Sequence, residues 1–119
     1  MLNQKPVVLL IEDDENVNAA NRQILEREGY EVRVARSIAE ARRLAGGRTE
    51  LAILDIDLPD GSGLSFLPEL CALTGGVLVL SGNRGAAVSA VQSGARGFIG
   101  KPYRLDDLCR KVKALAAES

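Results

Sequence analysis

The sequence has 119 residues, 46% of them hydrophobic, which is the composition of one folded domain of ordinary size. Fifteen Lys and Arg residues oppose sixteen Asp and Glu residues, so the formal charge of -1 argues against direct binding of nucleic acid or of an anionic membrane. The chain contains no histidine, which excludes histidine general bases, phosphohistidine carriers and histidine-ligated zinc. Any chemistry must therefore use carboxylates, hydroxyl groups or lysine.

Cysteine usage and the N-terminal residues indicate the compartment. Cys71 and Cys109 lie far apart without CxxC spacing, so we expect reduced, partly buried thiols and a cytoplasmic location. The N-terminal apolar run covers only residues 6–11, whereas a membrane span needs about 20 residues. We therefore expect no targeting segment and no membrane partner.

Five short apolar runs, each followed by a polar loop and a helical pattern, predict alternating β-strands and α-helices. The runs cover residues 6–11, 32–35, 51–54, 77–80 and 98–99. The first, third and fourth runs are apolar without alternation, as expected for strands that are buried on both faces of a parallel sheet. The predicted sheet therefore needs helices on both sides.

The first helix is predicted from apolar spacing that ends at a glycine. Val17, Ala20, Ile24 and Leu25 fall on one helical face, which we expect to be the buried face. The helix should end near Gly29, because glycine readily adopts the left-handed conformation of a helix C-terminus.

The remaining helices are predicted from their end signals and apolar stripes. Ser37 and Glu40 have capping-box spacing, and the helix that they begin should stop at residues 46–47. Pro68 predicts a late start or a kink in the third helix, and the fourth, over residues 86–93, is barely two turns long. The last helix has one apolar stripe, formed by Leu105, Leu108, Val112 and Leu115.

Five βα units with no long linker predict an α/β fold with a doubly wound, five-stranded parallel sheet. The common strand order for such a sheet is 2-1-3-4-5, the flavodoxin-like (βα)5 arrangement. In this order the carboxyl ends of strands 1 and 3 border a crevice, where open α/β sheets bind their ligands. We expect any functional site there, within a single domain that covers residues 1–119.

Acidic residues gather at this crevice. Carboxylates that lie close together repel one another, so their pKa values rise or a cation neutralises them. Hard oxygen ligands in a small site favour Mg²⁺, which pairs with phosphate oxygens. The clusters therefore predict a phosphoryl-transfer site. Seven of the sixteen acids belong to them: Glu12, Asp13, Asp14, Glu15, Asp55, Asp57 and Asp60.

Each cluster also has a simpler structural interpretation. Asp13 or Asp14 can cap the first helix, and Asp57 and Asp60 can belong to a Pro-Asp-Gly turn. The convergence of both clusters at adjacent strand ends favours the functional interpretation.

Strands 4 and 5 add a hydroxyl group and a cation to the same edge of the sheet. Ser81 directly follows the run 77–80, and Lys101 follows the last strand and precedes Pro102. The lysine can balance phosphoryl charge, the serine can donate a hydrogen bond, and one Asp can be the attacking carboxylate.

In this order and spacing, the motifs resemble the receiver domain of two-component response regulators, over essentially the whole chain. The matching motifs are Glu12-Asp13, Asp55 with Leu58-Pro59-Asp60-Gly61, Ser81, and residues 94–102 with Phe98 and Lys101-Pro102.

The resemblance implies a role for each acid. Asp55 is then both the phosphoacceptor and a Mg²⁺ ligand, Asp13 binds Mg²⁺ directly, and Glu12 assists through water. The backbone carbonyl of Asp57 is a further Mg²⁺ ligand, and Asp14 is a loop acid. The register in which Asp13 and Asp14 form the acid pair is a second interpretation of the same residues.

The resemblance also implies a switch. Ser81 would move toward the phosphoryl group, Lys101 would contact its oxygens, and Phe98 would change between outward and inward rotamers. Phe98 can also be a structural aromatic residue. The Lys101-Pro102 peptide bond would be cis. The surface near the fourth helix, strand 5 and the fifth helix would respond, although the connections at residues 74–76 and 81–94 are shorter than is usual in the family.

The implied protein is a signalling phosphoacceptor that catalyses only its own phosphorylation and dephosphorylation. Its donor would be a sensor histidine kinase, a phosphotransfer protein or an acyl phosphate. The output would pass to a partner protein or an output domain, and a homodimer can form through the fourth or fifth helix.

Two other functions are compatible with the residues. Asp55-x-Asp57 resembles the DxD motif of haloacid-dehalogenase-type phosphatases, although that motif usually opens the first strand of the chain and continues with Thr or Val, whereas here Pro59 follows. The second alternative is a receiver-like protein-interaction module that is not phosphorylated.

Overall fold

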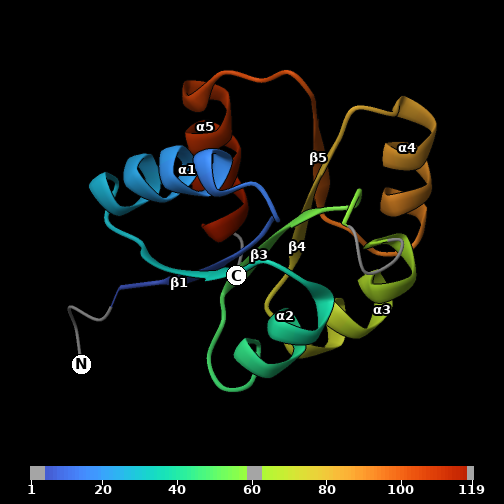
Figure 1. Ribbon diagram of the computed structural model, residues 1–119, viewed down its shortest axis with the longest axis horizontal. Helices are drawn as coiled ribbons and strands as arrows, with labels where there is room; N and C mark the ends of the chain where they lie inside the picture. Colours follow the sequence, from blue (N-terminus) through green and yellow to red (C-terminus); the bar gives the residue numbers. More distant parts are fainter. Residues whose placement is uncertain (1–4, 59–62, 118–119) are drawn as a thin grey trace.

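Five parallel strands form one sheet in the computed structural model, which describes residues 5–58 and 63–117 (Figure 1). Their order is β2-β1-β3-β4-β5, so the predicted fold class and strand order are confirmed. The strands are β1 (Val7–Ile11), β2 (Glu31–Ala35), β3 (Leu51–Asp55), β4 (Val77–Ser81) and β5 (Gly97–Gly100).

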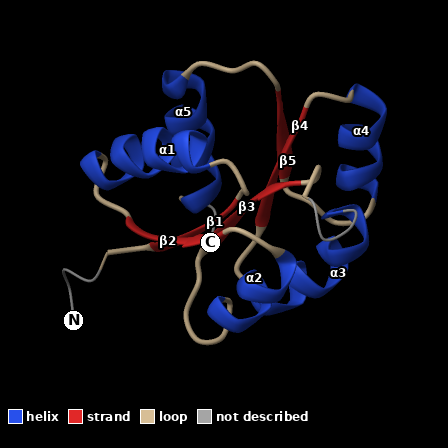
Figure 2. Cartoon of the chain, viewed as in Figure 1, coloured by secondary structure: helices blue, strands red, loops and turns tan. Residues whose placement is uncertain are grey.

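Helices cover both faces of the sheet, as Figures 1 and 2 show. On one face lie α1 (Glu15–Arg27) and α5 (Leu105–Ala116). On the other face lie α2 (Ile38–Leu44), α3 (Gly63–Leu73) and α4 (Arg84–Gln92).

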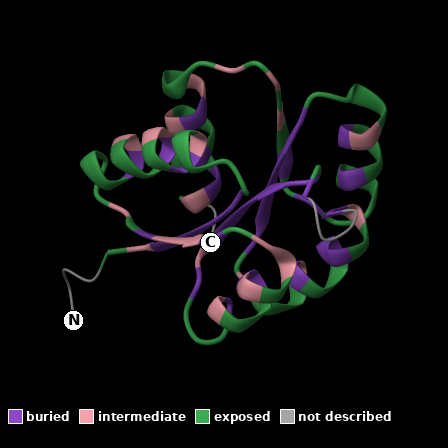
Figure 3. Ribbon diagram, viewed as in Figure 1, coloured by how far each residue is buried: buried purple, intermediate pink, exposed green. Residues whose placement is uncertain are grey.

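Every residue of β1, β3 and β4 is buried, which confirms the expectation from the continuous apolar runs (Figure 3). Successive side chains point to opposite faces. Leu9 and Ile11 enter the core under α2, α3 and α4, whereas Val8 and Leu10 enter the core under α1 and α5. The strand ends that carry the acids are therefore held from both sides.

The helix ends follow their sequence signals. Asp14 caps α1, because its Oδ1 accepts hydrogen bonds from the backbone N–H groups of Asn16 at 2.8 Å and Val17 at 3.2 Å. The Ser37 hydroxyl caps α2 by accepting from the Glu40 N–H at 3.1 Å. After α1, the backbone of Gly29 has a φ of +99°, the left-handed conformation that the sequence predicted.

The buried face of α1 differs from the prediction. Val17, Ala20 and Ile24 are only partly buried, whereas Asn18 and Asn21 face the interior together with the predicted Leu25. Ile24 still packs against the core under α1 and α5, so the buried face is rotated toward the two asparagines, whose amides both donate hydrogen bonds inside the protein.

The start of α3 also differs from the prediction. The helix begins at Gly63, before Pro68, and continues through the proline, so a late start was wrong. Pro68 lies on the exposed side, and the burial of Phe66, Leu67 and Leu70 outweighs the hydrogen bond that proline cannot donate.

Three further expectations concern α5, the thiols and the membrane. Leu105 is 38% exposed, unlike the other members of the α5 stripe, because it lies in the first turn beside an open cavity.

Cys71 and Cys109 are free and partly buried, as predicted. Within the described part of the chain, no helix has the length and apolar character to cross a membrane.

Candidate functional site

Four chemically active side chains meet at the carboxyl edge of the sheet. Glu12 follows β1, Asp55 ends β3, Ser81 ends β4 and Lys101 follows β5. The strand register aligns them, since Asp55 lies opposite Leu80 and Ser81 opposite Gly100. The four residues therefore share one edge of the sheet, where Glu12 and Lys101 line one cavity and Ser81 and Lys101 line another.

Asp55 is a buried carboxylate that accepts several hydrogen bonds. It is 3% exposed, its Oδ2 is paired with the Lys101 ammonium group, and its Oδ1 accepts from the Asp57 N–H at 2.9 Å. Burial alone would raise the pKa of this carboxyl group, but hydrogen bonds from Glu12, Lys101 and the Asp57 N–H hold the pKa below its ordinary value. Asp55 is therefore ionised at neutral pH, the state that a nucleophile needs.

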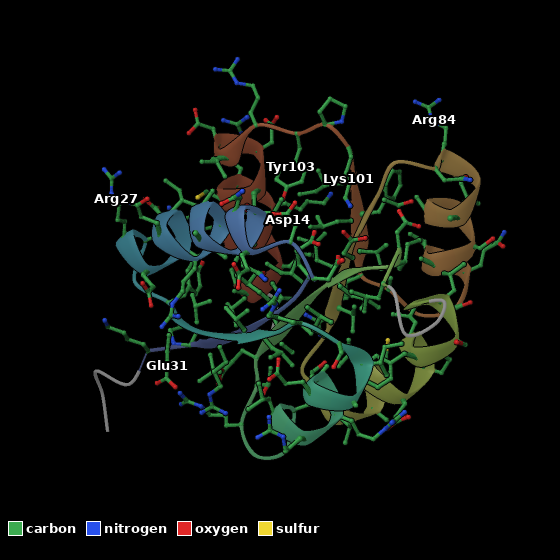
Figure 4. The ribbon with its side chains drawn as sticks, in the orientation of Figure 1. Asp14, Arg27, Glu31, Arg84, Lys101 and Tyr103 are labelled. Atoms are coloured by element: carbon green, nitrogen blue, oxygen red, sulfur yellow. The ribbon has the colours of Figure 1, made fainter. Side chains whose placement is uncertain are left out.

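Lys101 keeps its charge in this environment. Burial opposes the charged form, yet the hydrogen bond and charge of Asp55 raise the pKa of Lys101 above its ordinary value. The Lys101-Pro102 peptide bond is cis, as predicted. Figure 4 shows Lys101, Tyr103 and Asp14 at the same edge of the molecule, and Arg84 extending from the start of α4.

Glu12 is a second buried carboxyl group, 5% exposed, beside Asp55. Its side chain contacts the carboxyl groups of Asp55 and Asp13, and its Oε2 accepts from the Asp14 N–H at 3.0 Å. Burial, and next the hydrogen bond with Asp55, raise the pKa of Glu12 to about 8. Glu12 therefore shares a proton with the ionised Asp55 at neutral pH when no cation is near.

The paired carboxyl groups of Glu12 and Asp55 fit a small divalent cation, which would replace the shared proton. Mg²⁺ usually takes one or two carboxylates and completes its shell with water and phosphate oxygens. Across residues 5–58 and 63–117, no three or more His, Cys, Asp or Glu side chains are gathered to hold a metal on their own. The donor set therefore fits Mg²⁺ held by few protein ligands, and it does not form an all-protein cage.

The other predicted acids lie at the rim. Asp13 is exposed, and its backbone carbonyl accepts from Arg36 at 3.4 Å. Asp14 uses its carboxylate to cap α1, so the structural interpretation applies to this residue. Asp57 is exposed and donates its N–H to Asp55. Asp60 and the predicted Pro-Asp-Gly turn lie outside the described residues.

The Ser81 hydroxyl is engaged within the connection from β4 to α4. It accepts from the Asn83 N–H at 2.9 Å and donates to the Asn83 carbonyl at 3.1 Å. The Asn83 side chain then caps α4 by accepting from the Ala86 N–H at 3.0 Å. Phe98 is 39% exposed and lines a cavity of about 300 Å³ together with Ser81 and Lys101.

Three residues near the site were missed by sequence reasoning. Asn18 donates its amide to the Glu12 carbonyl at 2.7 Å, and Asn21 donates to the Tyr103 hydroxyl at 2.9 Å. An asparagine on the inner side of an amphipathic helix is the signal that could have found the two amides, because a buried amide needs a partner. Tyr103 has no such signal.

Comparison with known proteins places these features in a family. Residues 8–113 match the response regulator receiver domain. The swarming motility regulation protein RssB of Serratia marcescens is 34% identical over 113 residues, which cover 91% of this chain and 52% of RssB.

Solved structures agree with this match. The receiver domain protein (CheY-like) from Methanospirillum hungatei JF-1 has a TM-score of 0.89 and 30% identity, over 97% of this chain and 96% of that chain. A response regulator from Burkholderia pseudomallei, crystallised with a phosphorylated aspartic acid, a calcium ion and citrate, has a TM-score of 0.84 and 34% identity, over 96% and 70% of the two chains.

The chain therefore belongs to the receiver domains of two-component response regulators. Domains of this family generally bind Mg²⁺ and are signalling phosphoacceptors rather than classical enzymes. The chain spans about half the length of the curated relatives that it matches.

Proposed function

We propose that Asp55 accepts a phosphoryl group from the phosphohistidine of a sensor histidine kinase or phosphotransfer protein, or from a small acyl phosphate. The observation that carries this proposal is a buried, ionised carboxylate at a strand end, paired with Lys101 and in contact with the Glu12 carboxyl group. An Asp55 oxygen attacks phosphorus, and the bond from phosphorus to the donor nitrogen or oxygen breaks. The leaving group keeps the bonding electrons, and Asp55 becomes an aspartyl phosphate.

The neighbouring residues prepare this step. Lys101 orients the Asp55 carboxylate before transfer and can contact the phosphoryl oxygens afterwards, so its charge serves both states. Asp13 and Asp55 would hold Mg²⁺ directly, with Glu12 acting through water and the Asp57 backbone carbonyl as a further ligand. When bound, Mg²⁺ neutralises charge on the phosphoryl oxygens.

The response of the domain would begin at Ser81. Its hydroxyl now donates to the Asn83 carbonyl, and donating to a phosphoryl oxygen instead requires that this bond break. Because Asn83 caps α4, the change reaches the first turn of that helix. Phe98 would turn inward from its exposed position, and the surface of α4, β5 and α5 would carry the signal to an output partner or output domain.

We further propose that residues 1–119 form one cytoplasmic receiver domain. The charge of -1 supports the absence of direct nucleic-acid or membrane binding by this segment. The length of the curated relatives is compatible with an output domain in a longer protein, and a homodimer through α4 or α5 is part of the same proposal.

Intact-protein mass spectrometry after incubation with acetyl phosphate and Mg²⁺ tests this function. We expect wild-type protein to gain one phosphoryl group, EDTA to prevent the gain, and Asp55→Asn to gain none. Asp57→Asn is the matched control, because it removes a nearby exposed carboxylate and should still be phosphorylated.

A negative result has a defined meaning. Wild-type protein that gains no phosphoryl group and does not bind beryllofluoride would support the interaction module that is not phosphorylated. The phosphatase alternative is not proposed, because the chain belongs to the receiver family and the Asp57 carboxylate is exposed at the rim.

A further inference from the structure

A hydrogen bond joins α1 to the loop that follows Lys101. The Asn21 Nδ2 group donates to the Tyr103 hydroxyl at 2.9 Å, although the two residues are 82 positions apart. Asn21 is only 2% exposed and lies on the inner side of α1. A buried amide without a partner destabilises a fold, so the bond to Tyr103 compensates for burying this side chain.

The loop around Tyr103 has few other attachments. The Lys101 N–H donates to the Ser81 carbonyl at 2.9 Å, and Pro102 has no N–H to donate. Arg104, the N-cap residue of α5, makes no side-chain capping bond. Within residues 5–58 and 63–117, no backbone hydrogen bond holds Tyr103. The hydrogen bond from Asn21 to its hydroxyl group therefore ties this residue to α1.

Packing fixes Tyr103 only in part. The ring packs against the core under α1 and α5, but it also lines a cavity of about 510 Å³ between α1 and the loop. Glu12 and Lys101 line the same cavity, so it opens onto the acid cluster. Burial raises the pKa of the Tyr103 hydroxyl, which therefore stays protonated and accepts the bond from Asn21 through a lone pair.

Tyr103 lies two residues after Lys101 and at the same edge of the molecule (Figure 4). A shift of Tyr103 displaces the backbone from which the Lys101 side chain reaches Asp55. The Lys101 ammonium group must stay within hydrogen-bond distance of the Asp55 carboxylate, so a small displacement of Lys101 weakens this contact.

We propose that Asn21 is a positioning residue, which acts through Tyr103 to hold residues 101–103 so that Lys101 reaches the phosphoryl group on Asp55. This inference rests on the proposed phosphoryl transfer and adds to it a part of the chain outside the strand ends. Asn21 touches neither Asp55 nor the phosphoryl group. Its effect therefore depends on Tyr103.

The test removes the hydrogen bond from each side. Tyr103→Phe keeps the ring, Asn21→Leu keeps the side-chain volume, and the double variant removes both partners. Tyr30→Phe is the matched control, because Tyr30 packs against the same core and lies away from the site. Each protein is titrated with beryllofluoride at saturating Mg²⁺, with Mg²⁺ alone, and with acetyl phosphate.

We expect Tyr103→Phe and Asn21→Leu each to weaken beryllofluoride binding about 2- to 10-fold, the range that follows from losing one hydrogen bond. The double variant should bind beryllofluoride no more weakly than either single variant, because all three proteins lack the same hydrogen bond. Mg²⁺ affinity should stay unchanged, and Tyr30→Phe should behave as wild type.

Three outcomes would overturn the inference. The first is unchanged beryllofluoride binding in Tyr103→Phe. The second is a double variant in which the losses of beryllofluoride affinity of the two single variants add. The third is a loss of Mg²⁺ affinity as large as the loss of beryllofluoride affinity. Each of these two results would indicate a merely structural role. If Asn21→Leu fails to fold, Tyr103→Phe alone decides. Wild-type protein that neither gains a phosphoryl group nor binds beryllofluoride would instead overturn the proposed function, and this inference with it.

Discussion

The ammonium group of Lys101 stabilises the negative charge of the buried Asp55 carboxylate. In Lys101→Met, the Asp55 charge would lose its counterion, and we expect the free energy of unfolding at pH 7 to fall by about 1–3 kcal/mol. The Lys101 side chain is 32% exposed, so water replaces part of the lost interaction. Urea denaturation in chelator-treated buffer measures the change.

Lys113→Met is the control for this prediction, because Lys113 is an exposed residue in the last turn of α5. If Lys101→Met and Lys113→Met have the same stability as wild type, the ion pair with Asp55 does not stabilise the fold.

Glu12 binds its proton more tightly in the folded chain than in the unfolded chain. Its pKa rises from an ordinary 4.5 to about 8, so its contribution to stability is complete below about pH 4.5 and is lost as the pH rises through 8. In metal-free buffer, we expect the free energy of unfolding to fall between about pH 5 and pH 8. Chemical denaturation at several pH values measures this slope.

Glu12→Gln should flatten the slope, because glutamine does not titrate. Saturating Mg²⁺ should also flatten it in wild-type protein, since the cation takes the place of the proton. An equally steep slope in Glu12→Gln would show that another group causes the pH dependence.

The residues of the site divide into those that sequence could place and those that it could not. Asp55, Ser81 and Lys101 could be placed together, because each ends or follows a strand and parallel strands end at one edge of the sheet. Asn21 and Tyr103 could not, because their contact depends on how α1 is rotated about its own axis. Asn21 lies on the helical face of Val17, Ala20, Ile24 and Leu25, but its position in the sequence does not show which residue of a distant loop it contacts.

Among the helices, α1 owes its start to Asp14. The side chain accepts two backbone hydrogen bonds, so we expect Asp14→Ala to lower the free energy of unfolding by about 1 kcal/mol, whereas Asp14→Ser keeps a cap and most of the stability. Thermal denaturation measures both changes. Neither substitution should reduce phosphorylation by acetyl phosphate.

The same variants decide which acids form the metal pair. Asp13→Ala should greatly weaken Mg²⁺ binding, and Asp14→Ser should not, as titration calorimetry can show. An equal loss of Mg²⁺ affinity in Asp14→Ser would favour the register in which Asp13 and Asp14 form the pair.

Element boundaries were predictable where local signals decide them. Capping residues and Gly29 gave the ends of α1 and the start of α2, because these contacts are made within a few residues. The start of α3 was not predictable, because the burial of Phe66 and Leu67 by the sheet and the neighbouring helices outweighs the local preference of Pro68.

At the scale of the whole molecule, one sheet separates two cores. The Cα radius of gyration is 12.8 Å, close to the roughly 13–14 Å of a compact domain of this length. β1, β3 and β4 contribute side chains to both cores, so we expect the two cores to unfold together. This topology could be predicted from continuous apolar strands, which require helices on both faces.

We therefore expect residues 1–119 to unfold in one cooperative transition. Far-ultraviolet circular dichroism follows the whole fold, whereas tyrosine fluorescence follows the core under α1 and α5, against which both tyrosines pack. The two urea curves should nevertheless coincide. Curves with separate midpoints would show that the two cores unfold independently.

The central claim is that the Asp55 carboxylate receives the phosphoryl group, and borohydride trapping tests it most directly. The protein is incubated with acetyl phosphate and Mg²⁺, reduced with borohydride, digested and mapped by mass spectrometry. An acyl phosphate is reduced to the alcohol, so we expect homoserine at position 55 and unchanged aspartate at positions 13, 14 and 57. Homoserine at another aspartate, with position 55 unmodified, would contradict the claim.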